Sequence, residues 1–196
     1  DKLKDIIFNY IKGITLDGNN IYIAEDNLLN SGTKDTQNTW MDAKIGNYVV
    51  TPRNGKAVEI NSLWYNSLKT LEYLAKKFED KETLNSVKNL AKKHKEAFKQ
   101  KFYNPKKKCL YDVIDDDKIR PNQLFALATT YPVLEPNSIE AKETFKTCTA
   151  KLLLPKGLKT LARGEDGYVP DYEGDSFKRD MCYHQGPTWP WLLGIY

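Results

Sequence analysis

Residues 38–66 bring acidic, basic and aromatic side chains together in a single stretch of the chain. Asp42, Arg53 and Glu59 lie there, interspersed with Trp40 and Trp64. A polar segment crowded with aromatic rings is typical of a carbohydrate-binding surface, because rings stack on sugar faces while polar groups bind hydroxyls. Hydrolysis of a glycoside needs two carboxyl groups, one to protonate the leaving oxygen and one to activate water. Asp42 and Glu59 are therefore the first candidates for that chemistry.

Both carboxylates also have ordinary structural interpretations. An aspartate beside a tryptophan commonly caps a helix or hydrogen-bonds within a loop, and Glu59 near a helix start would stabilise the helix dipole. Similar polar groups stand at other predicted helix starts, where capping is the simplest explanation. These groups are Arg120, Asn122 and Gln123, and His184 and Gln185 ahead of Trp189 and Trp191. Because several such clusters combine polar and aromatic side chains, they indicate one shared pocket.

The elements that position these residues are mainly helical. Apolar residues recur at helical spacing from Lys2 to Lys12, from Val58 to Phe78 and, after a predicted N-cap at Asp80, on to Phe98. Further helices are predicted to begin at Pro121, at Asn137 and at Pro187. Residues 17–20 form a predicted turn, residues 21–23 and 110–114 are short extended pieces, and residues 27–37 and 157–180 are loops. This pattern predicts an all-α fold with a loop-built site at one end.

Composition excludes several classes of protein. A length of 196 residues with 40% hydrophobic and 29% charged side chains fits one soluble domain, and no apolar run approaches a membrane span. The formal charge of +4 comes from lysines spread over helix surfaces, which does not favour nucleic-acid binding. Cys109, Cys148 and Cys182 show no metal-binding spacing, so free thiols in the reducing cytoplasm are expected.

Three motifs carry a resemblance to a known family. They are TWMDAKIGNYVVTPRNGKAVEINSLWYNSL, RPNQLFAL and YEGD…RDMCYHQGPTWPWLLG. In this order they resemble the C-terminal catalytic domain of glycogen debranching enzymes, the amylo-α-1,6-glucosidase part. The resemblance runs from about Asn38 to the end of the chain. It implies an (α/α)6 toroid, built from six helical hairpins, that hydrolyses the α-1,6-linked glucose at a branch point with inversion and without a metal or organic cofactor.

The resemblance also implies roles for individual residues. Asp42 matches the aspartate of the family's TWMD motif and would be the general acid. Substrate-binding positions are implied for Trp40, Arg53, Glu59, Trp64, Arg120, Asn122, Gln123, His184, Gln185 and Trp189. The family's general base lies in a glutamate-containing segment after the WPWLLG helix, and this chain ends before it. We therefore expect residues 1–196 to form an incomplete toroid that continues beyond Tyr196 and carries the acid but not the base.

Two alternatives to this interpretation stay open. One is a related (α/α)6 α-glucosidase that acts on other α-glucosides, as a trehalase-like hydrolase does. The other is a glucan-binding fragment without hydrolytic activity. Under the debranching interpretation the expected partner is a branched α-glucan, either glycogen or limit dextrin. Neither a nucleic acid nor a membrane is an expected partner. The apolar faces of an unfinished toroid further predict self-association.

Overall fold

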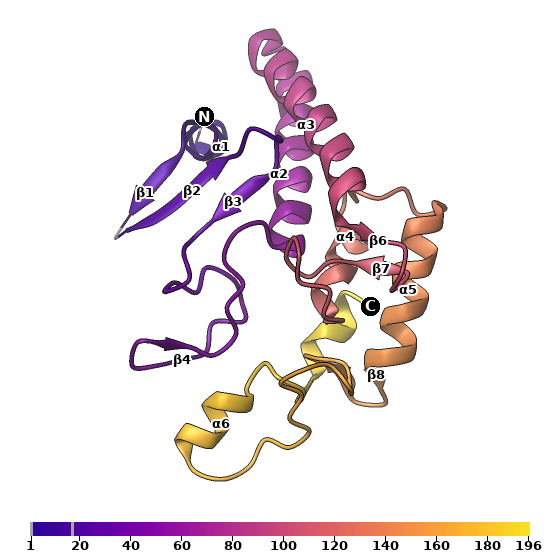
Figure 1. Ribbon diagram of the computed structural model, residues 1–196. Helices are drawn as coiled ribbons and strands as arrows, with labels where there is room; N and C mark the ends of the chain where they lie inside the picture. The colour runs from indigo at the N-terminus through magenta and orange to yellow at the C-terminus, as the bar shows by residue number, and fades with distance from the viewer. Residues whose placement is uncertain (1, 17) are drawn as a thin grey trace.

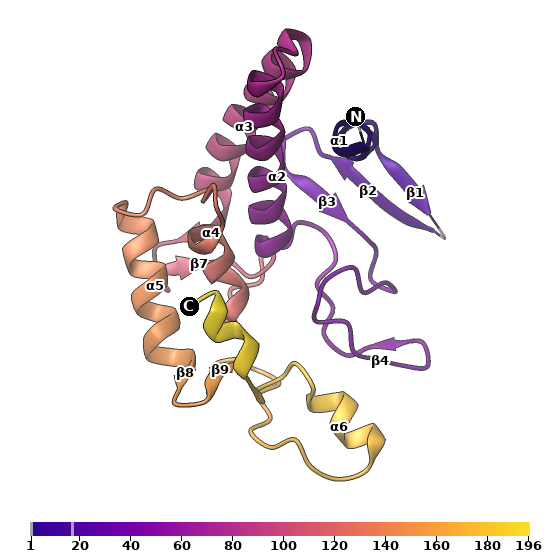
Figure 2. The same ribbon diagram turned by 180° about the vertical axis from the view of Figure 1, so that it is seen from behind.

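The computed structural model describes residues 2–16 and 18–196. In these residues the chain forms six α-helices, two short 3₁₀ helices and ten strands of at most five residues. The two longest helices, α2 (Val58–Lys77) and α3 (Lys81–Phe102), run antiparallel side by side (Figure 1). A small sheet and α1 lie on one side of this pair and α5 lies on the other, as the view from behind also shows (Figure 2). The fold is therefore helix-rich with small sheets.

The hairpin of α2 and α3 confirms the two long helices that the apolar periodicity predicts. Leu68, Leu71 and Ala75 of α2 are buried three or four residues apart, which places them on one helix face. On α3 the buried residues are Thr83, Val87, Ala91, His94, Phe98 and Phe102. Asp80 caps α3 as predicted, because its carboxylate accepts hydrogen bonds from the backbone N–H of Thr83 at 3.0 Å and from its hydroxyl at 2.7 Å.

The N-terminal part confirms the first predicted helix. Helix α1 (Lys2–Lys12) ends at Gly13, whose φ of +89° and N–H to the carbonyl of Tyr10 at 3.2 Å form the expected C-cap. Strands β1 (Ile14–Leu16), β2 (Asn19–Ile23) and β3 (Leu29–Ser31) then form an antiparallel sheet in that order. Strand β3 falls within a predicted loop, and part of the predicted turn at residues 17–20 lies outside the described residues. Strands β4 (Lys44–Ile45) and β5 (Tyr48–Val49) form a separate hairpin.

The middle of the chain follows the prediction with shifted boundaries. Strands β6 (Tyr103–Asn104) and β7 (Cys109–Leu110) pair, so only the start of the predicted extended piece at residues 110–114 is a strand. The helix expected at Pro121 begins as the 3₁₀ helix η1 (Pro121–Leu124) and continues as α4 (Phe125–Ala128). Helix α5 (Ile139–Leu152) is capped by Ser138 rather than begun by Asn137, and its buried face is Ala141, Thr144, Cys148 and Leu152.

Two predictions for the C-terminal part are wrong. The expected loop at residues 157–180 contains β9 (Gly157–Lys159), paired with β8 (Leu153–Leu154), and the start of α6 (Ser176–Cys182). The helix expected from Pro187 begins only with the 3₁₀ helix η2 (Pro190–Gly194), because Thr188–Trp189 is strand β10 beside β9. Pro190 disfavours the helical conformation in the residue before it, which explains the late start.

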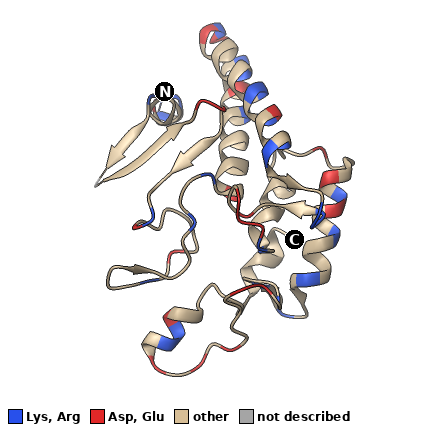
Figure 3. Ribbon diagram, in the orientation of Figure 1, with Lys and Arg blue, Asp and Glu red and all other residues tan. Residues whose placement is uncertain are grey.

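Two apolar cores flank the region where the candidate residues meet. The larger core joins α1, α2, α3 and α4 through residues such as Leu68, Phe98 and Phe102. The smaller joins η1, α5, β9 and η2 through Leu124, Leu152, Leu158 and Leu192, with Trp40 and Trp189 packed against it. Charged side chains of both signs are spread along α3 and α5 (Figure 3). In the described ranges, neither long helix is apolar enough to cross a membrane.

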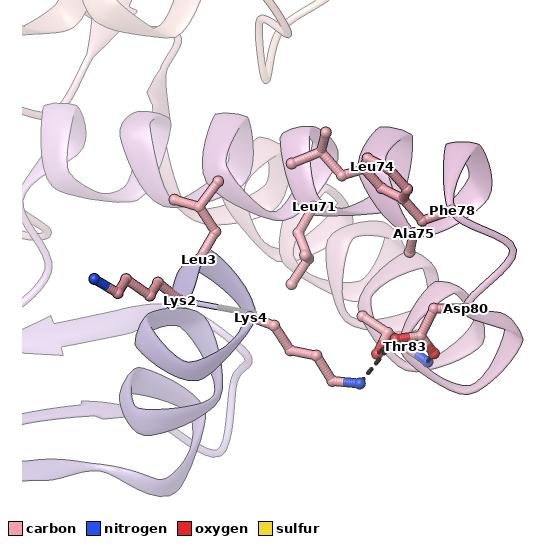
Figure 4. A pocket seen from close by; sticks show the side chains of 9 residues that line it. All are labelled: Lys2, Leu3, Lys4, Leu71, Leu74, Ala75, Phe78, Asp80 and Thr83. Carbon is pink, nitrogen blue, oxygen red and sulfur yellow. Dashed lines mark hydrogen bonds and ion pairs between the residues drawn. The ribbon is translucent and has the colours of Figure 1, made fainter.

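An apolar surface lies at the far end of α2 from its N-terminus. A cavity of about 530 Å³ there is lined by Leu3 of α1 and by Leu71, Leu74 and Phe78 of the α2–α3 hairpin, and Lys4 pairs with Asp80 at its edge (Figure 4). Leu3 is 54% exposed and Phe78 is 73% exposed. Because a helix rises about 1.5 Å per residue, this surface lies roughly 20–25 Å along α2 from Glu59. It is therefore separate from the candidate site.

Candidate active site

A buried cluster of charges lies at the N-terminal end of α2. Arg53, from the loop before α2, donates to both carboxylate oxygens of Glu59 in the first helical turn. The same guanidinium donates through Nε to Oδ2 of Asp112 at 2.6 Å and through Nη2 to Oδ1 at 3.1 Å. The side chains of Arg53, Glu59 and Asp112 are each at most 2% exposed. One arginine therefore joins the segment after β7 to the start of α2.

The electrostatic balance of the cluster requires a second arginine. Nε of Arg120 lies 3.6 Å from Oδ2 of Asp112, so two guanidinium groups face two carboxylates. Burial opposes the charge on Arg53, but the carboxylates of Asp112 and Glu59 outweigh burial and raise the pKa of Arg53. Burial lowers the pKa of Arg120, and the attraction of Asp112 offsets this only in part. A buried charge is tolerated when it is paired and hydrogen-bonded, which is the arrangement here.

Arg120 also fixes the turn after α6. Its Nη1 donates to the backbone carbonyls of His184 at 2.6 Å and Thr160 at 3.1 Å. Its Nη2 donates to Oε1 of Gln185 at 2.8 Å. Gln123, at the end of η1, accepts from the backbone N–H of Arg120 at 3.0 Å and donates to the carbonyl of Leu110 at 2.8 Å. The start of η1 therefore positions the segment that carries His184 and Gln185.

A line of hydrogen bonds connects this buried layer to an aromatic layer. Trp40 donates its Nε1–H to Oδ1 of Asn122 at 2.7 Å, and Nδ2 of Asn122 donates to Oδ1 of Asp112 at 2.8 Å. Trp40 meets Trp191 edge to face at 4.9 Å and Trp189 at 6.3 Å. Edge-to-face contacts of this kind hold rings in defined orientations. The indole of Trp40 is thus fixed at both its polar and its apolar edge.

Asp42 lies at the exposed margin of these layers. Its side chain is 64% exposed, and its Oδ1 lies 3.8 Å from Nε2 of His184, whose side chain is only 1% exposed. Burial lowers the pKa of His184 to about 4, although the charge of Asp42 acts in the opposite direction. His184 is therefore neutral at neutral pH. Asp42 is the accessible carboxylate among the predicted site residues of the central cluster. The ring beside it, His184, packs against the rings of Trp40 and Trp189.

A cavity of about 520 Å³ is reached by one predicted site residue, Gln185. Tyr48 and Val50 line it from β5 and the residue that follows, and Phe177 and Met181 line it from α6. Gln185 belongs both to this cavity and to the buried network, since its Nε2 donates to the carbonyl of Val50 at 3.1 Å. Tyr48 and Phe177 are 59% and 58% exposed, so their rings are available to a ligand. This cavity therefore lies between the β4–β5 hairpin and α6, and Asp42 is not among the residues that line it.

The structure brings most of the predicted site residues together. Directly connected by hydrogen bonds or ring contacts are Trp40, Arg53, Glu59, Arg120, Asn122, Gln123, His184, Gln185 and Trp189, and Asp42 lies beside His184. Trp64 lies elsewhere: it is 5% exposed and packs in the larger core against Tyr10 of α1. Its predicted role in the pocket has no support from this position. Glu59 binds Arg53 with both oxygens, so sugar binding by Glu59 stays a prediction.

Asp112 is the residue that the sequence-based interpretation missed. It lies in the extended piece at residues 110–114, and its backbone carbonyl accepts from the N–H of Val58 at 2.9 Å. Alternation along an extended segment places residues 110 and 112 on the same face. Because Leu110 is buried, this alternation indicates that Asp112 is buried as well and therefore needs a basic partner. In the described part of the chain no group of three or more metal-ligating side chains gathers.

An exposed carboxyl beside aromatic rings, over a buried layer of paired charges, is an arrangement suited to a glycoside hydrolase. The family model for amylo-alpha-1,6-glucosidase matches residues 1–196, so the chain belongs to this family. The chain is also similar to the glycogen debranching enzyme of Saccharomyces cerevisiae, with 27% identity over 239 aligned positions. That alignment covers 96% of this chain and 15% of the yeast protein, so the chain spans about one seventh of the length of that relative.

Proposed function

We propose that this chain is part of a glucosidase domain that hydrolyses the α-1,6-linked glucose at the branch points of glycogen or limit dextrin. The observation that carries the proposal is Asp42: an exposed carboxyl group beside His184, whose ring packs against Trp40 and Trp189, in a chain that belongs to the amylo-alpha-1,6-glucosidase family. The yeast relative is named glycogen debranching enzyme, which supports a branched α-glucan as the substrate. Aromatic rings beside a carboxyl group suit a glucose unit, which has an apolar face and hydroxyl edges.

In this proposal Asp42 is the general acid. Its protonated carboxyl group gives a proton to the glycosidic oxygen while the bond from that oxygen to C1 breaks. Inversion then requires a second carboxylate that activates water on the opposite face of the sugar. Neither Glu59 nor Asp112 suits that task, because both are buried and bound by Arg53. We therefore propose that neither of these two carboxylates is the general base.

The same reasoning assigns the buried layer a supporting role. Arg53, Glu59, Arg120 and Asn122 use their polar atoms on one another and on Asp112. Their contribution in this proposal is to hold Trp40, His184 and Gln185 in place around the glucose unit. Effects of this kind are large because small displacements of catalytic groups lower rates strongly.

The predicted (α/α)6 toroid also stays a proposal. The long α2–α3 hairpin supports it, as does the position of the site at the loop end of α2. The exposed apolar side chains of Leu3, Ile6, Leu63 and Phe78 support a neighbouring helix or self-association on that face. A structure of the whole protein tests the toroid, and light scattering of the chain alone tests self-association.

The decisive experiment is glucose release from a branched limit dextrin by the whole protein and by its Asp42→Asn variant. We expect a loss of at least about a hundredfold in kcat, as is typical for removal of a general acid. Unchanged glucose release would show that Asp42 is not the acid. Hydrolysis of trehalose without release of branch-point glucose would favour the trehalase-like alternative.

A glucan-binding function without hydrolysis is the second candidate for the isolated chain. It is favoured by the pairing of Glu59 and Asp112 with Arg53, which leaves Asp42 as the accessible carboxylate of the described cluster. Calorimetric titration of the 196-residue chain with isomaltose and maltooligosaccharides tests it. Binding without glucose release is the expected result.

A further inference from the structure

The imidazole of His184 is buried without hydrogen-bond partners for its ring nitrogens. In the described part of the chain, neither Nδ1 nor Nε2 has one. The second histidine shows the usual situation, since the ring nitrogens of His94 each lie 3.0 Å from a backbone carbonyl oxygen, of Asn27 and of Asn61. Nε of Arg120 in the same cluster also lacks a hydrogen-bond partner, but His184 is the residue of the described chain with two such buried atoms. Because buried polar groups are nearly always satisfied, this ring calls for a partner that the resting arrangement holds out of range.

The polar atom that faces Nε2 belongs to Asp42. Oδ1 of Asp42 lies 3.8 Å away, about 0.6 Å beyond the ordinary N–H···O range. Catalytic hydrogen bonds are often long in the absence of substrate and shorten when it binds. The Asp42 side chain is 64% exposed, so few neighbouring atoms restrain it.

The imidazole itself has little freedom to move. It stacks on Trp189 at 5.8 Å with an interplanar angle of 23°, and it meets the edges of Trp40 at 5.1 Å and Tyr183 at 4.8 Å. Its backbone carbonyl is held by Nη1 of Arg120 at 2.6 Å. His184 is therefore a fixed polar group beside an exposed carboxyl group.

The protonation state of His184 follows from its surroundings. Burial lowers its pKa to about 4, the charge of Asp42 raises the pKa, and the positive charges of Arg120 and Arg53 lower it further. The other acids of the cluster, Glu59 and Asp112, are paired with Arg53 and Arg120. The ring is therefore neutral at neutral pH and carries one N–H, which is a donor to Asp42 in the tautomer that has this hydrogen on Nε2.

We propose that His184 is a positioning residue for Asp42: its Nε2–H donates a hydrogen bond to Oδ1, so that Oδ2 carries the proton toward the glycosidic oxygen. This inference rests on the proposed function. In the chemical step the proton leaves Oδ2 and bonds to the glycosidic oxygen, which also takes the electron pair of the breaking bond to C1. Asp42 becomes a carboxylate, and His184 keeps its proton.

This hydrogen bond gains strength as the reaction proceeds. A neutral carboxyl group accepts it before proton transfer, and a carboxylate accepts it afterwards, when the interaction is about twice as strong. Only interactions that strengthen toward the transition state accelerate the chemical step. His184 thus favours proton donation without binding the sugar, which differs from its predicted role as a residue that lines the subsite. Its 1% side-chain exposure agrees with a position behind Asp42 and Trp40.

The test compares two substrates in the whole protein. The α-1,6 glucose of limit dextrin needs a protonated leaving oxygen, whereas fluoride leaves from α-glucosyl fluoride with little help from an acid. His184→Phe keeps a flat ring between Trp189 and Trp40 but removes the donor. We expect its kcat on limit dextrin to fall about tenfold to a hundredfold, with KM changed less than about twofold. On α-glucosyl fluoride we expect less than about a threefold loss in kcat.

Two further variants keep the inference testable if His184→Phe fails to fold. The amide of His184→Gln reaches about as far as Nε2 and should restore much of the activity on limit dextrin, whereas the shorter His184→Asn should not. Equal losses on both substrates, or a rise in KM alone, would overturn the positioning role. The Asp42→Asn variant distinguishes failure of the positioning role of His184 from failure of the proposed function. If that variant still releases branch-point glucose, the acid assignment is wrong. If it does not, but the His184 variants affect both substrates equally, only the positioning role is lost.

Discussion

Arg53 donates its Nε–H to Oδ2 of Asp112 at 2.6 Å, and both side chains are at most 2% exposed. This pair connects the segment after β7 to the loop before α2, so it joins two parts of the chain 59 positions apart. Through Asn122 the same aspartate is connected to Trp40, which borders the candidate active site. The stability of the buried cluster and the geometry of the site are thus coupled through one carboxylate.

Asp112→Asn should therefore destabilise the protein strongly. The substitution removes one of two buried negative charges and leaves Arg53 and Arg120 with only Glu59 to balance them. Breaking a buried ion pair from one side costs about 3–5 kcal/mol. Urea denaturation measures the change in the free energy of unfolding. The matched control is Glu135→Gln, because Glu135 is 62% exposed in its pair with Lys95 and should cost less than about 1 kcal/mol. If the two substitutions lowered the free energy of unfolding equally, the buried charge of Asp112 would not be a major source of stability.

Asp42→Asn and Glu59→Gln should have opposite profiles. Asp42 is largely exposed, so its replacement should change the free energy of unfolding by less than about 0.5 kcal/mol while kcat falls at least about a hundredfold. Glu59 binds Arg53 with both oxygens, so its replacement should cost about 3 kcal/mol or more in stability. Glucose release and urea denaturation on the same samples separate the two. If Glu59→Gln lost activity at unchanged stability, Glu59 would be a catalytic or sugar-binding residue after all.

The long helices could be predicted because their signals are redundant. On α2 and α3, apolar periodicity, the Asp80 cap and basic residues in the last turn all agree. Helix α6 was missed because it has only seven residues and lies in a polar stretch, where its Asp175 cap is the main signal. Thr188–Trp189 was misassigned because its apolar neighbours suit a helix, and only pairing with distant β9 makes it a strand. Short elements depend on partners far away in the sequence, which periodicity does not reveal.

The sequence could predict most of the residues that form the candidate site. It could not predict their arrangement into a buried layer of paired charges and an aromatic layer. Polar and aromatic residues at helix starts pointed to one shared pocket, and the structure brings most of them together. Residue type alone did not separate Trp40, which borders the site, from Trp64, which packs in the core. Nor did it show that Glu59 would bind Arg53 or that Asp112 would complete the cluster. These distinctions depend on burial and on contacts across the fold.

The stability of the protein should fall between pH 7.5 and pH 5 because of His184. Its pKa is lowered from 6.5 to about 4 in the folded state, so the unfolded chain binds more protons in this range and protonation favours unfolding. The contribution is fully present above pH 6.5 and is lost as the pH falls toward 4. It amounts to about 2 kcal/mol between pH 7.5 and pH 5.

The comparison with His184→Phe isolates this contribution. Burial also lowers the pKa of His94, so both proteins lose some stability on acidification for that reason. Urea denaturation at the two pH values should show a loss in the unmodified protein that exceeds the loss in His184→Phe by about 2 kcal/mol. A parallel decline of the two proteins would mean that His184 is not held neutral by its surroundings.

Gly186 should be intolerant of a side chain because it holds the turn between His184 and β10. Its φ is +152°, and an added Cβ would lie 2.1 Å from the carbonyl oxygen of Val169. The backbone N–H of Val169 is itself fixed by the carbonyl of Gln185 at 2.7 Å, so the two segments cannot separate without breaking that bond. Gly186→Ala should therefore cost about 2–4 kcal/mol in stability and displace His184 and Gln185 from Arg120. We expect kcat for branch-point glucose release to fall as well.

Gly164→Ala is the matched control for this substitution. Gly164 has a φ of +94°, but an added Cβ would meet nothing within 4 Å, so only the backbone cost of about 1–2 kcal/mol remains. Kinetics and urea denaturation of the two variants should show a loss of kcat for Gly186→Ala alone, because the added Cβ at Gly164 displaces no neighbouring group. If Gly186→Ala kept full kcat despite lower stability, the turn would not determine the position of His184. If both variants lost kcat to the same extent, a general loosening of residues 157–186 would explain the effect better than a displaced imidazole.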